Sequence, residues 1–221
     1  MQHFPLPKST DRPALVILAA GDFPHGEEAR ALLNAADEVI CCDGAAEEYC
    51  ATGAMPVAVV GDFDSLSQDL RTRLADRLYH RPDQDVNDLW KALSLARERG
   101  VQEVVVLGAF GRREDHSIGN LMLCAARMNE VAIHVVGDRG VFEFIDSDSE
   151  FESFAGEQVS LLTLSPSTEI STDGLRYEPP QNHLTAMWQG VSNESLGEQF
   201  TISCCFDSTE LSAYIYDAFT T

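Results

Sequence analysis

The stretch VAVVGDFDS, residues 57–65, gives the clearest indication of the fold of this 221-residue chain. Its first four residues are all apolar, a pattern typical of a strand buried on both faces of a parallel sheet. The glycine and aspartate that follow are residues that end strands and begin loops. Four similar apolar runs occur in the first two-thirds of the chain, at residues 14–20, 39–42, 104–107 and 133–136. The sequence therefore predicts a sheet of buried, parallel strands.

Helices are expected between these runs, because apolar residues there recur at three- and four-residue spacing. They cover residues 27–36, 45–50, 68–78, 87–99 and 117–128. Strands that alternate with helices predict an α/β fold with an open, doubly wound, mostly parallel sheet. Beyond residue 140 the pattern changes to short apolar runs separated by Gly, Pro, Ser and Asn, at residues 142–145, 151–154, 159–164, 200–206 and 213–216. We therefore expect an α/β domain over residues 1–140 and a small antiparallel β domain over residues 141–221.

The charge and the cysteines of the chain restrict its partners and its compartment. The net charge is −21, and the Lys and Arg side chains that bind nucleic acids and anionic membranes are scarce. Neither kind of partner is expected, and an anionic substrate would need a metal cation. The six cysteines show no C-x-x-C pair and no zinc-site spacing, and no apolar run resembles a signal core or a membrane span. We expect reduced thiols and a cytoplasmic protein.

Two aspartates, Asp62 and Asp64, directly follow the strand expected at residues 57–60. In extended backbone, residues two apart point to the same side, so their carboxylates would converge. Converging carboxylates suit Mg²⁺, which prefers oxygen ligands and keeps substrate phosphates in its coordination shell. The alternative is an Asp-rich turn whose side chains bond to nearby backbone N–H groups.

A second acidic segment precedes the helix expected at residues 87–99. Asp85 lies three residues before Asp88, which is the spacing of a capping pair, and the helix is expected to begin near Asp85. Asp88 would lie in the first helical turn. It could therefore line a metal site while the helix N-terminus faces phosphate.

The loop at residues 108–116 combines two glycines with Arg112 and Arg113. Close backbone approach and a planar guanidinium group suit phosphate recognition, whereas the alternative is a surface loop with solvated charges. Asp115 or Ser117 could cap the helix that follows, and His116 is either a general base or a structural residue. Neither a P-loop nor a dinucleotide-binding fingerprint occurs in the chain.

Taken in order, these motifs resemble the thiamine pyrophosphokinase family. The family patterns C-x-D-G, G-D-F-D-S, D-x-D-x-T-D and G-A-x-G-G-R-x-D-H match successive segments between Cys41 and His116. Two later segments, STDGLRY at residues 171–177 and VSNE at residues 191–194, are similar to the family segments S-T-x-G-L-x-W and I/V-S-N-E. Several motifs in one order are far more specific than any single motif.

The resemblance implies an enzyme that transfers the diphosphoryl group of ATP to the hydroxyl of thiamine and releases AMP. It also implies a nucleotide-binding catalytic domain, a thiamine-binding β-sandwich, and a homodimer with active sites shared between subunits. The implied ligands of Mg²⁺ are Asp62, Asp64 and Asp88, which form the catalytic set together with Arg113. The implied nucleotide contacts are Asp43, Gln84, Asp85 and Asp115, and the implied thiamine contacts are Ser171, Tyr177, Ser192 and Asn193.

The chain departs from the family pattern at three positions, where Asn87 replaces Thr, Arg112 replaces Gly, and Tyr177 replaces Trp. Tyrosine offers a thiazolium cation a weaker aromatic face than tryptophan does. Three other functions fit parts of the pattern: diphosphorylation of another alcohol such as a hydroxymethylpterin, non-catalytic sensing of a nucleotide or thiamine, and D-x-D phosphatase activity. The aromatic motif favours thiamine. The three retained aspartates disfavour a sensor, and the position of Asp62 after a later strand disfavours a phosphatase.

Overall fold

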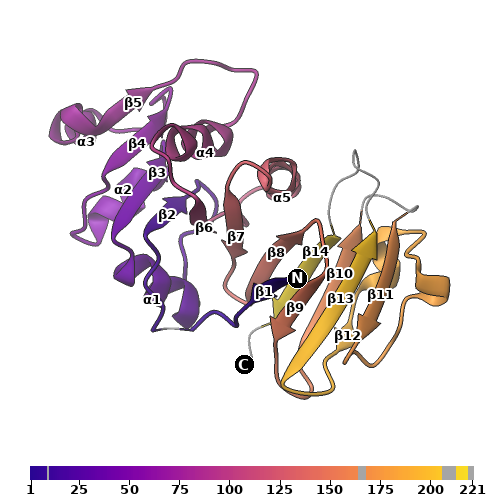
Figure 1. Cartoon of the computed structure of the whole chain (residues 1–221). Coiled ribbons are helices and arrows are strands. Elements are labelled where there is room, and N and C mark those ends of the chain that lie inside the picture. The colour runs from indigo at the N-terminus through magenta and orange to yellow at the C-terminus, as the bar shows by residue number, and fades with distance from the viewer. Residues whose placement is uncertain (9, 164–167, 206–212, 219–221) are drawn as a thin grey trace. The chain divides into compact units, whose positions relative to one another are not determined.

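The computed structural model describes residues 1–8, 10–163, 168–205 and 213–218, coloured along the chain in Figure 1. The chain divides into two compact units. One unit is Ser9–Asp138, and the other combines Met1–Lys8 with Arg139–Thr221. The first eight residues therefore belong to the same unit as the C-terminal part of the chain.

The unit Ser9–Asp138 contains a parallel sheet with the strand order β7-β6-β2-β3-β4-β5. Its strands are β2 (Leu15–Leu18), β3 (Glu38–Cys42), β4 (Ala58–Gly61), β5 (Leu78–His80), β6 (Glu103–Leu107) and β7 (Ala132–Val136). The residues of β2 and β4 are all buried, as expected for strands covered on both faces. The chain adds strands on one side of β2 as far as β5 and then returns to the other side for β6. This reversal creates a switch point, where open α/β sheets bind ligands beyond the carboxyl ends of their strands.

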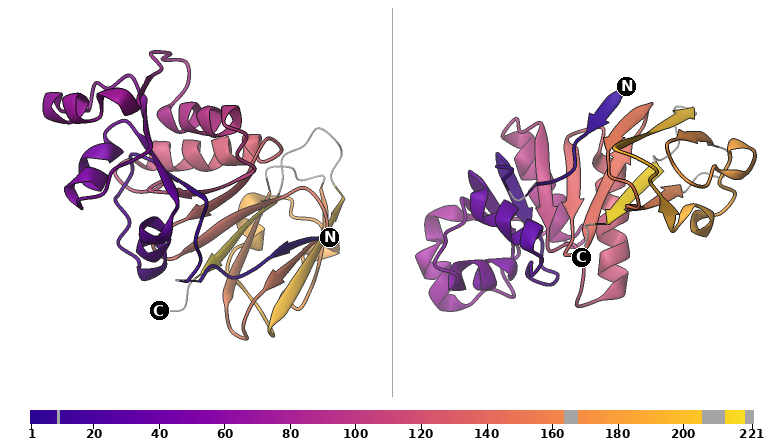
Figure 2. Two further views of the ribbon diagram at one scale, coloured as in Figure 1. Left: turned by 60° about the vertical axis from the view of Figure 1, so that its left-hand side comes forward. Right: turned by 90° about the horizontal axis from the view of Figure 1, so that it is seen from below.

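Helices cover both faces of this sheet, so the expected doubly wound fold is confirmed. Figures 1 and 2 show α4 and α5 on one face and α1 and α2 on the other. The helices are α1 (Glu27–Ala35), α2 (Ala45–Ala51), α3 (Gln68–Arg73), α4 (Asp88–Glu98) and α5 (Glu114–Arg127). None of the helices in the described part of the chain is both long and apolar enough to cross a membrane.

Three expected helix boundaries in this unit are wrong. The segment 68–78 is not one helix, because α3 is followed by a 3₁₀ turn (Ala75–Arg77) and by the edge strand β5. Helix α4 does not begin near Asp85: Asn87 is its N-cap, and the Asn87 side chain accepts a hydrogen bond from the Trp90 N–H. Helix α5 begins three residues before Ser117 and has no side-chain cap. The Ser117 hydroxyl instead donates to the carbonyl of Arg113.

The other unit contains two sheets with the strand orders β1-β9-β13-β11 and β12-β10-β14-β8. The strands are β1 (Gln2–Phe4), β8 (Gly140–Ile145), β9 (Ser149–Glu152), β10 (Gln158–Thr163), β11 (Glu169–Asp173), β12 (Asn193–Glu194), β13 (Gln199–Cys205) and β14 (Ala213–Ala218). Side chains from both sheets form one buried apolar cluster, which includes Leu161 of β10 and Phe200 of β13. This shared core confirms the β-sandwich.

The sandwich also departs from expectation in several places. Its strand β1 comes from the start of the chain and pairs with β9 in parallel rather than antiparallel. The Phe4 ring stacks on Phe151 with ring centroids 4.7 Å apart, which ties β1 to the core. The strand expected at residues 151–154 runs from Ser149 to Glu152, and β11 and β12 were not expected. Leu164 and Phe206, the ends of two expected strands, lie outside the described residues.

Candidate active site

A hollow of about 690 Å³ lies within Ser9–Asp138, lined by the loops after β2, β3, β4, β5 and β6 and by the N-terminal parts of α4 and α5. The parallel strands bring these loops to one edge of the sheet, where the sequence places its acidic and glycine-rich motifs. The volume lies within the range of small-molecule sites. The hollow is therefore the first candidate for the chemistry of this chain.

Four carboxylates meet in this hollow around Gly61, the last residue of β4. Asp43, Asp62 and Asp64 each offer one oxygen, and these three oxygens lie within 4.8 Å of one another. A Cβ atom added to Gly61 would lie 3.4 Å from the carboxyl carbons of both Asp43 and Asp88. The absence of a side chain at Gly61 is thus what allows Asp43 and Asp88 to approach the same point. We call Asp43, Asp62, Asp64 and Asp88 the carboxylate cluster.

Asp43 is the most enclosed member of the carboxylate cluster, with 3% of its surface exposed. Its Oδ2 accepts a hydrogen bond of 3.3 Å from the Ser65 N–H, while its buried Oδ1 finds no donor among the described residues. Burial, and then the charges of Asp88 and Asp64, raise the pKa of Asp43 to about 6 despite the Ser65 hydrogen bond. An unpartnered buried carboxylate oxygen beside two further carboxylates fits a hard divalent cation. The sequence had suggested Asp43 only as a nucleotide contact.

Asp62 and Asp64 lie in a tight turn. Asp62 accepts hydrogen bonds from the Gln84 side chain at 2.8 Å and from the Asp64 N–H at 3.2 Å. These two bonds, followed by the charge of Lys91, lower the pKa of Asp62. The backbone is not extended here, because Phe63 adopts a φ of 67°. The local hydrogen bonding of an Asp-rich turn and the convergence of carboxylates therefore occur together.

Asp88, expected as the third metal ligand, is the first residue of α4 and accepts a hydrogen bond of 2.9 Å from the Nζ of Lys91. Lys91 is only 4% exposed. Sequence reasoning missed this lysine, although it follows Asp88 by almost one helical turn on a helix whose sheet-facing residues include Leu89 and Ala92. A lysine on the apolar stripe of a helix was the available signal.

A chain of amide groups connects the loops around the hollow. The Asn87 side chain donates to Asn120 Oδ1 at 3.0 Å, and the buried Asn120 amide donates to the carbonyl of Ala109 at 2.9 Å. Asn87 thus both caps α4 and joins it to α5, a second role that the sequence did not indicate. Asp85 also lines the hollow, and its N–H donates to the side chain of Asp83.

The glycine-rich loop after β6 makes close contact with another loop of the same unit, which the sequence did not indicate. Gly111 has a φ of 84°, and a Cβ added there would collide with the carboxylate of Asp22. The Asp22 N–H donates to the carbonyl of Phe110 at 2.7 Å. These glycines therefore allow the loops after β2 and β6 to interlock. Arg112, at the position where the family pattern has Gly, keeps a positive φ of 57°, and its guanidinium pairs with Glu48 of α2.

The next arginine, Arg113, is paired within its own loop. It makes a bidentate contact with Asp115, with distances of 3.0 and 2.5 Å, and both side chains are largely exposed. This contact lowers the pKa of Asp115 to about 2 and raises that of Arg113. Arg113 and the exposed His116 both line the hollow, whereas Asp115 does not belong to its lining.

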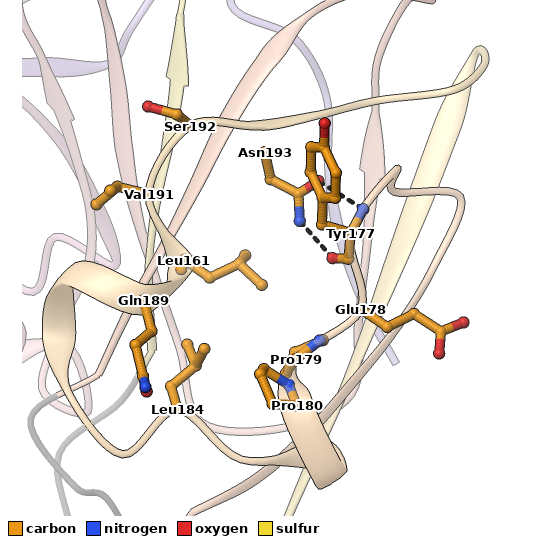
Figure 3. A pocket seen from close by; sticks show the side chains of 11 residues that line it. Leu161, Tyr177, Glu178, Pro179, Pro180, Leu184, Gln189, Val191, Ser192 and Asn193 are labelled. Carbon is orange, nitrogen blue, oxygen red and sulfur yellow. Dashed lines mark hydrogen bonds between the residues drawn. The ribbon is translucent and has the colours of Figure 1, made fainter.

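The β-sandwich unit has a pocket of its own, of about 250 Å³, around Tyr177. Figure 3 shows Tyr177 beside Asn193, with two dashed hydrogen bonds between them. The Tyr177 N–H donates to Asn193 Oδ1 at 3.0 Å, and the Asn193 amide donates to the Tyr177 carbonyl at 2.6 Å. Asn193 is buried, so its amide serves to position Tyr177, a residue that is itself 61% exposed. Leu161 and Leu184 supply apolar walls.

The two serines expected to contact thiamine lie in different places. Ser192 lines the Tyr177 pocket with a φ of 61°, and its N–H donates to the Ser160 hydroxyl. Ser171, on strand β11, does not line that pocket. It lines a separate hollow of about 200 Å³ together with Asp148 and Glu169. The structure therefore brings Tyr177, Ser192 and Asn193 together and leaves Ser171 apart from them.

The fold and the two pockets define an α/β enzyme with a carboxylate-rich site and a β-sandwich that carries a smaller pocket. Family models match both parts of the chain: the catalytic domain of thiamin pyrophosphokinase matches residues 29–136, and the substrate-binding domain of thiamin pyrophosphokinase matches residues 140–208. The chain belongs to the thiamin pyrophosphokinase family, and the resemblance seen in its motifs is confirmed.

Individual relatives and solved structures agree with this assignment. The thiamine pyrophosphokinase of Bacillus subtilis is 26% identical over 161 residues, which cover 68% of this chain and 75% of that protein. Thiamine pyrophosphokinase 1 of rice is 28% identical over 170 residues, or 69% of this chain and 63% of the relative. The structure of the enzyme from Geobacillus thermodenitrificans superposes with a TM-score of 0.77 at 22% identity, over 94% of this chain and 98% of that one. The structure of yeast thiamin pyrophosphokinase superposes with a TM-score of 0.75 at 15% identity, over 99% of this chain and 91% of that one.

Proposed function

We propose that the chain transfers the diphosphoryl group of ATP to thiamine. The thiamine hydroxyl would lose its proton to a carboxylate of the site or to water, and its oxygen would bond to the β-phosphorus. The bond from the β-phosphorus to the oxygen bridging it to the α-phosphorus would break, and AMP would leave with that oxygen. The observation that carries this proposal is the carboxylate cluster at the carboxyl edge of a parallel sheet. It offers three oxygens within 4.8 Å of one another, which is the donor set of a site for a hard cation that accompanies phosphate.

The cation that we propose for this site is Mg²⁺, held by Asp43, Asp62 and Asp64 with Asp88 beside them. When bound, it supplies positive charge that neutralises the triphosphate. Asp62 is suited to remain ionised because Gln84 and the Asp64 N–H both donate hydrogen bonds to it. Gln84 would thus act by orienting Asp62, and Asp85 and Asn87 would complete the wall of the hollow.

Charge on the transferred group requires cations from the protein as well. Arg113 lines the hollow, and its contact with Asp115 is exposed to solvent, so the guanidinium group can exchange partners at little cost. We propose that Arg113 binds the triphosphate in a planar fork and stabilises charge that develops during transfer, while Asp115 holds it in the empty site. Positioning and charge neutralisation supply most of the catalysis in reactions of this type.

Thiamine is proposed to occupy the pocket around Tyr177. Its thiazolium ring is a cation, and an aromatic face attracts cations. Tyr177 presents such a face and is held by Asn193, and Glu178 is another residue of the pocket lining. We assign contact to Tyr177 and Ser192, and positioning to Asn193. The position of Ser171 in a separate hollow gives its proposed contact no support.

The proposed working unit is a homodimer with shared active sites. In support, the carboxylate cluster lies wholly in one compact unit and the Tyr177 pocket wholly in the other, so the proposed reaction would need both kinds of unit, which two chains can supply to each other. Trp188, 75% exposed, is an apolar side chain suited to an interface. The test is to refold inactive Asp64→Ala chains together with Tyr177→Ala chains and to assay the mixture at a thiamine concentration at which the Tyr177→Ala parent has little activity. Shared sites restore activity in mixed dimers, whereas mixed dimers that form and stay inactive contradict sharing.

AMP formation that depends on thiamine tests the proposed reaction itself. The purified chain should release AMP from ATP with Mg²⁺ and thiamine, and should not do so with a hydroxymethylpterin. AMP release with the pterin instead would identify another alcohol as the substrate. Binding of both ATP and thiamine without any AMP release would indicate a sensor. We propose a cytoplasmic location, supported by four buried cysteines of the described chain that are free thiols, Cys41, Cys42, Cys50 and Cys124.

A further inference from the structure

Lys91 has no role in the function proposed above, yet its position is unusual. The chain contains only two lysines, Lys8 and Lys91, among 15 basic residues. The Lys8 side chain is 60% exposed, as is ordinary for lysine, whereas Lys91 is 4% exposed. Lysine is almost never this buried unless its charge has a partner. A strongly acidic chain has thus enclosed one of its two ammonium groups in the wall of the carboxylate-rich hollow.

The geometry of α4 directs this ammonium group toward the hollow. Side chains of a helix lean toward its N-terminus, so the four-carbon stem carries Nζ back to the first turn. There Nζ donates to Asp88 at 2.9 Å, and its charge also acts on Asp62. An ammonium group has three N–H donors. In the part of the chain that the structure describes, it hydrogen-bonds to Asp88 alone.

We propose that Lys91 is a phosphate-binding residue whose ammonium group exchanges Asp88 for a triphosphate oxygen when the nucleotide enters. This inference rests on the proposed function. Asp88 lies beside the cation site, and a carboxylate engaged by a cation holds a nearby lysine less strongly. A buried ammonium group without an anion is costly, so Lys91 then needs another anion. The incoming triphosphate is the anion that the same hollow admits.

The competing interpretation is that Lys91 only neutralises Asp88 and keeps that partner throughout. Nuclear magnetic resonance separates the two, because a chain labelled in its lysine ε-CH₂ and ammonium groups contains just two labelled side chains. Lys91→Met and Lys8→Met variants assign the two resonances. Mg²⁺ with α,β-methylene-ATP, an analogue whose bridging carbon blocks transfer, should move the Lys91 resonance and leave that of Lys8 in place. A Lys91 resonance that stays put while backbone amides of the hollow report bound analogue overturns the inference.

Calorimetric affinities give a second measurement. Lys91→Met keeps an unbranched stem and removes the charge, and loss of a charge-assisted hydrogen bond should weaken binding of the Mg²⁺ analogue complex roughly 10- to 100-fold. Lys8→Met is the matched control and should bind as the wild type does. In an Asp88→Asn background the loss should persist, whereas a lysine that only neutralises Asp88 would then have no effect. If the wild type itself fails to bind the analogue, the proposed function fails as well, which is a distinct result.

Discussion

Gly61→Ala is expected to disable the carboxylate cluster while leaving the parallel sheet folded. Gly61 ends β4, and an added Cβ would lie 2.9 Å from the Cβ of Asp43. That atom is attached directly to the backbone, so no side-chain rotation relieves the contact. Restoring a carbon–carbon separation of about 3.5–4.0 Å requires a shift of roughly 1 Å in the Asp43 turn or in β4.

The size of the effect follows from this displacement. Overpacking of this kind costs about 1–3 kcal/mol, which is less than the ordinary stability of a domain, so the variant should fold. A misplacement of roughly 1 Å in a positioning group costs on the order of 100-fold in rate. We therefore expect thiamine-dependent AMP formation to fall by about this factor, with a higher Mg²⁺ concentration needed for half-maximal rate.

Gly119→Ala is the matched control. Gly119 lies within α5, and an added Cβ meets no atom within 4 Å. This substitution should stabilise the protein by about 0.5–1 kcal/mol and leave turnover unchanged, because alanine favours helix more than glycine does. Circular dichroism and thermal unfolding establish that both variants fold. A folded Gly61→Ala enzyme whose kcat/KM stays within about threefold of the wild type refutes the proposed importance of the convergence at Gly61.

Four further substitutions test other parts of the proposal. The raised pKa of Asp43, about 6, means that its neutral form, which is the more stable form in the folded protein, is lost as pH rises from 4 to 7. Without metal, Asp43→Asn should therefore have a higher unfolding free energy than the wild type, by a margin that grows over this range to about 3 kcal/mol. Equal pH profiles of the two proteins would contradict this. Asp88→Asn should still fold but with a lower unfolding temperature, because the buried Lys91 ammonium group loses its anionic partner, and it should lose most turnover; near-normal turnover would remove Asp88 from the site. Tyr177→Ala should weaken thiamine binding roughly tenfold in calorimetry, with ATP binding unchanged. Arg112→Gly should have an unfolding free energy equal to that of the wild type or up to about 1 kcal/mol higher, because glycine relieves the strain of the positive φ and the lost ion pair with Glu48 is exposed. A clearly lower unfolding free energy would show that the ion pair stabilises the protein.

The sequence predicted the architecture best where burial is complete. Three residues of the run at 57–60, residues 58–60, lie in the fully buried strand β4, and strands covered on both faces leave an unbroken apolar pattern that can be read without knowledge of neighbours. Strand β5 was missed because it is a three-residue edge strand, only partly buried, that exists through its pairing with β4. Strand β1 was missed for a similar reason: its partner β9 lies more than 140 residues away, and no local pattern in residues 2–4 indicates it.

The candidate site was predictable in its residue types and less so in its contacts. The sequence placed Asp62 and Asp64 in one loop after a buried strand, at the edge where the carboxyl ends of parallel strands meet, although their backbone is not extended as expected. The convergence of Asp43 on the same point depends on the missing side chain of Gly61, which is a tertiary contact between β3 and β4. Lys91 was not predicted: its place among the apolar residues of the helix was a signal, but its contact with Asp88 depends on the helix being docked on the sheet.

The charges of the hollow explain why the site is arranged in this way. Each of its arginines and its lysine is paired with a carboxylate: Lys91 with Asp88, Arg112 with Glu48, and Arg113 with Asp115. Asp43, Asp62 and Asp64 have no such cationic partner among the described ion pairs, and they are the three whose oxygens converge. Carboxylates this close repel one another, and the raised pKa of Asp43 reflects that cost together with its burial. A divalent cation would relieve the repulsion at the three converging oxygens, while a triphosphate would compete for the paired cations. The same arrangement, unfavourable without ligands, would therefore favour the joint binding of a metal ion and a nucleotide that we propose.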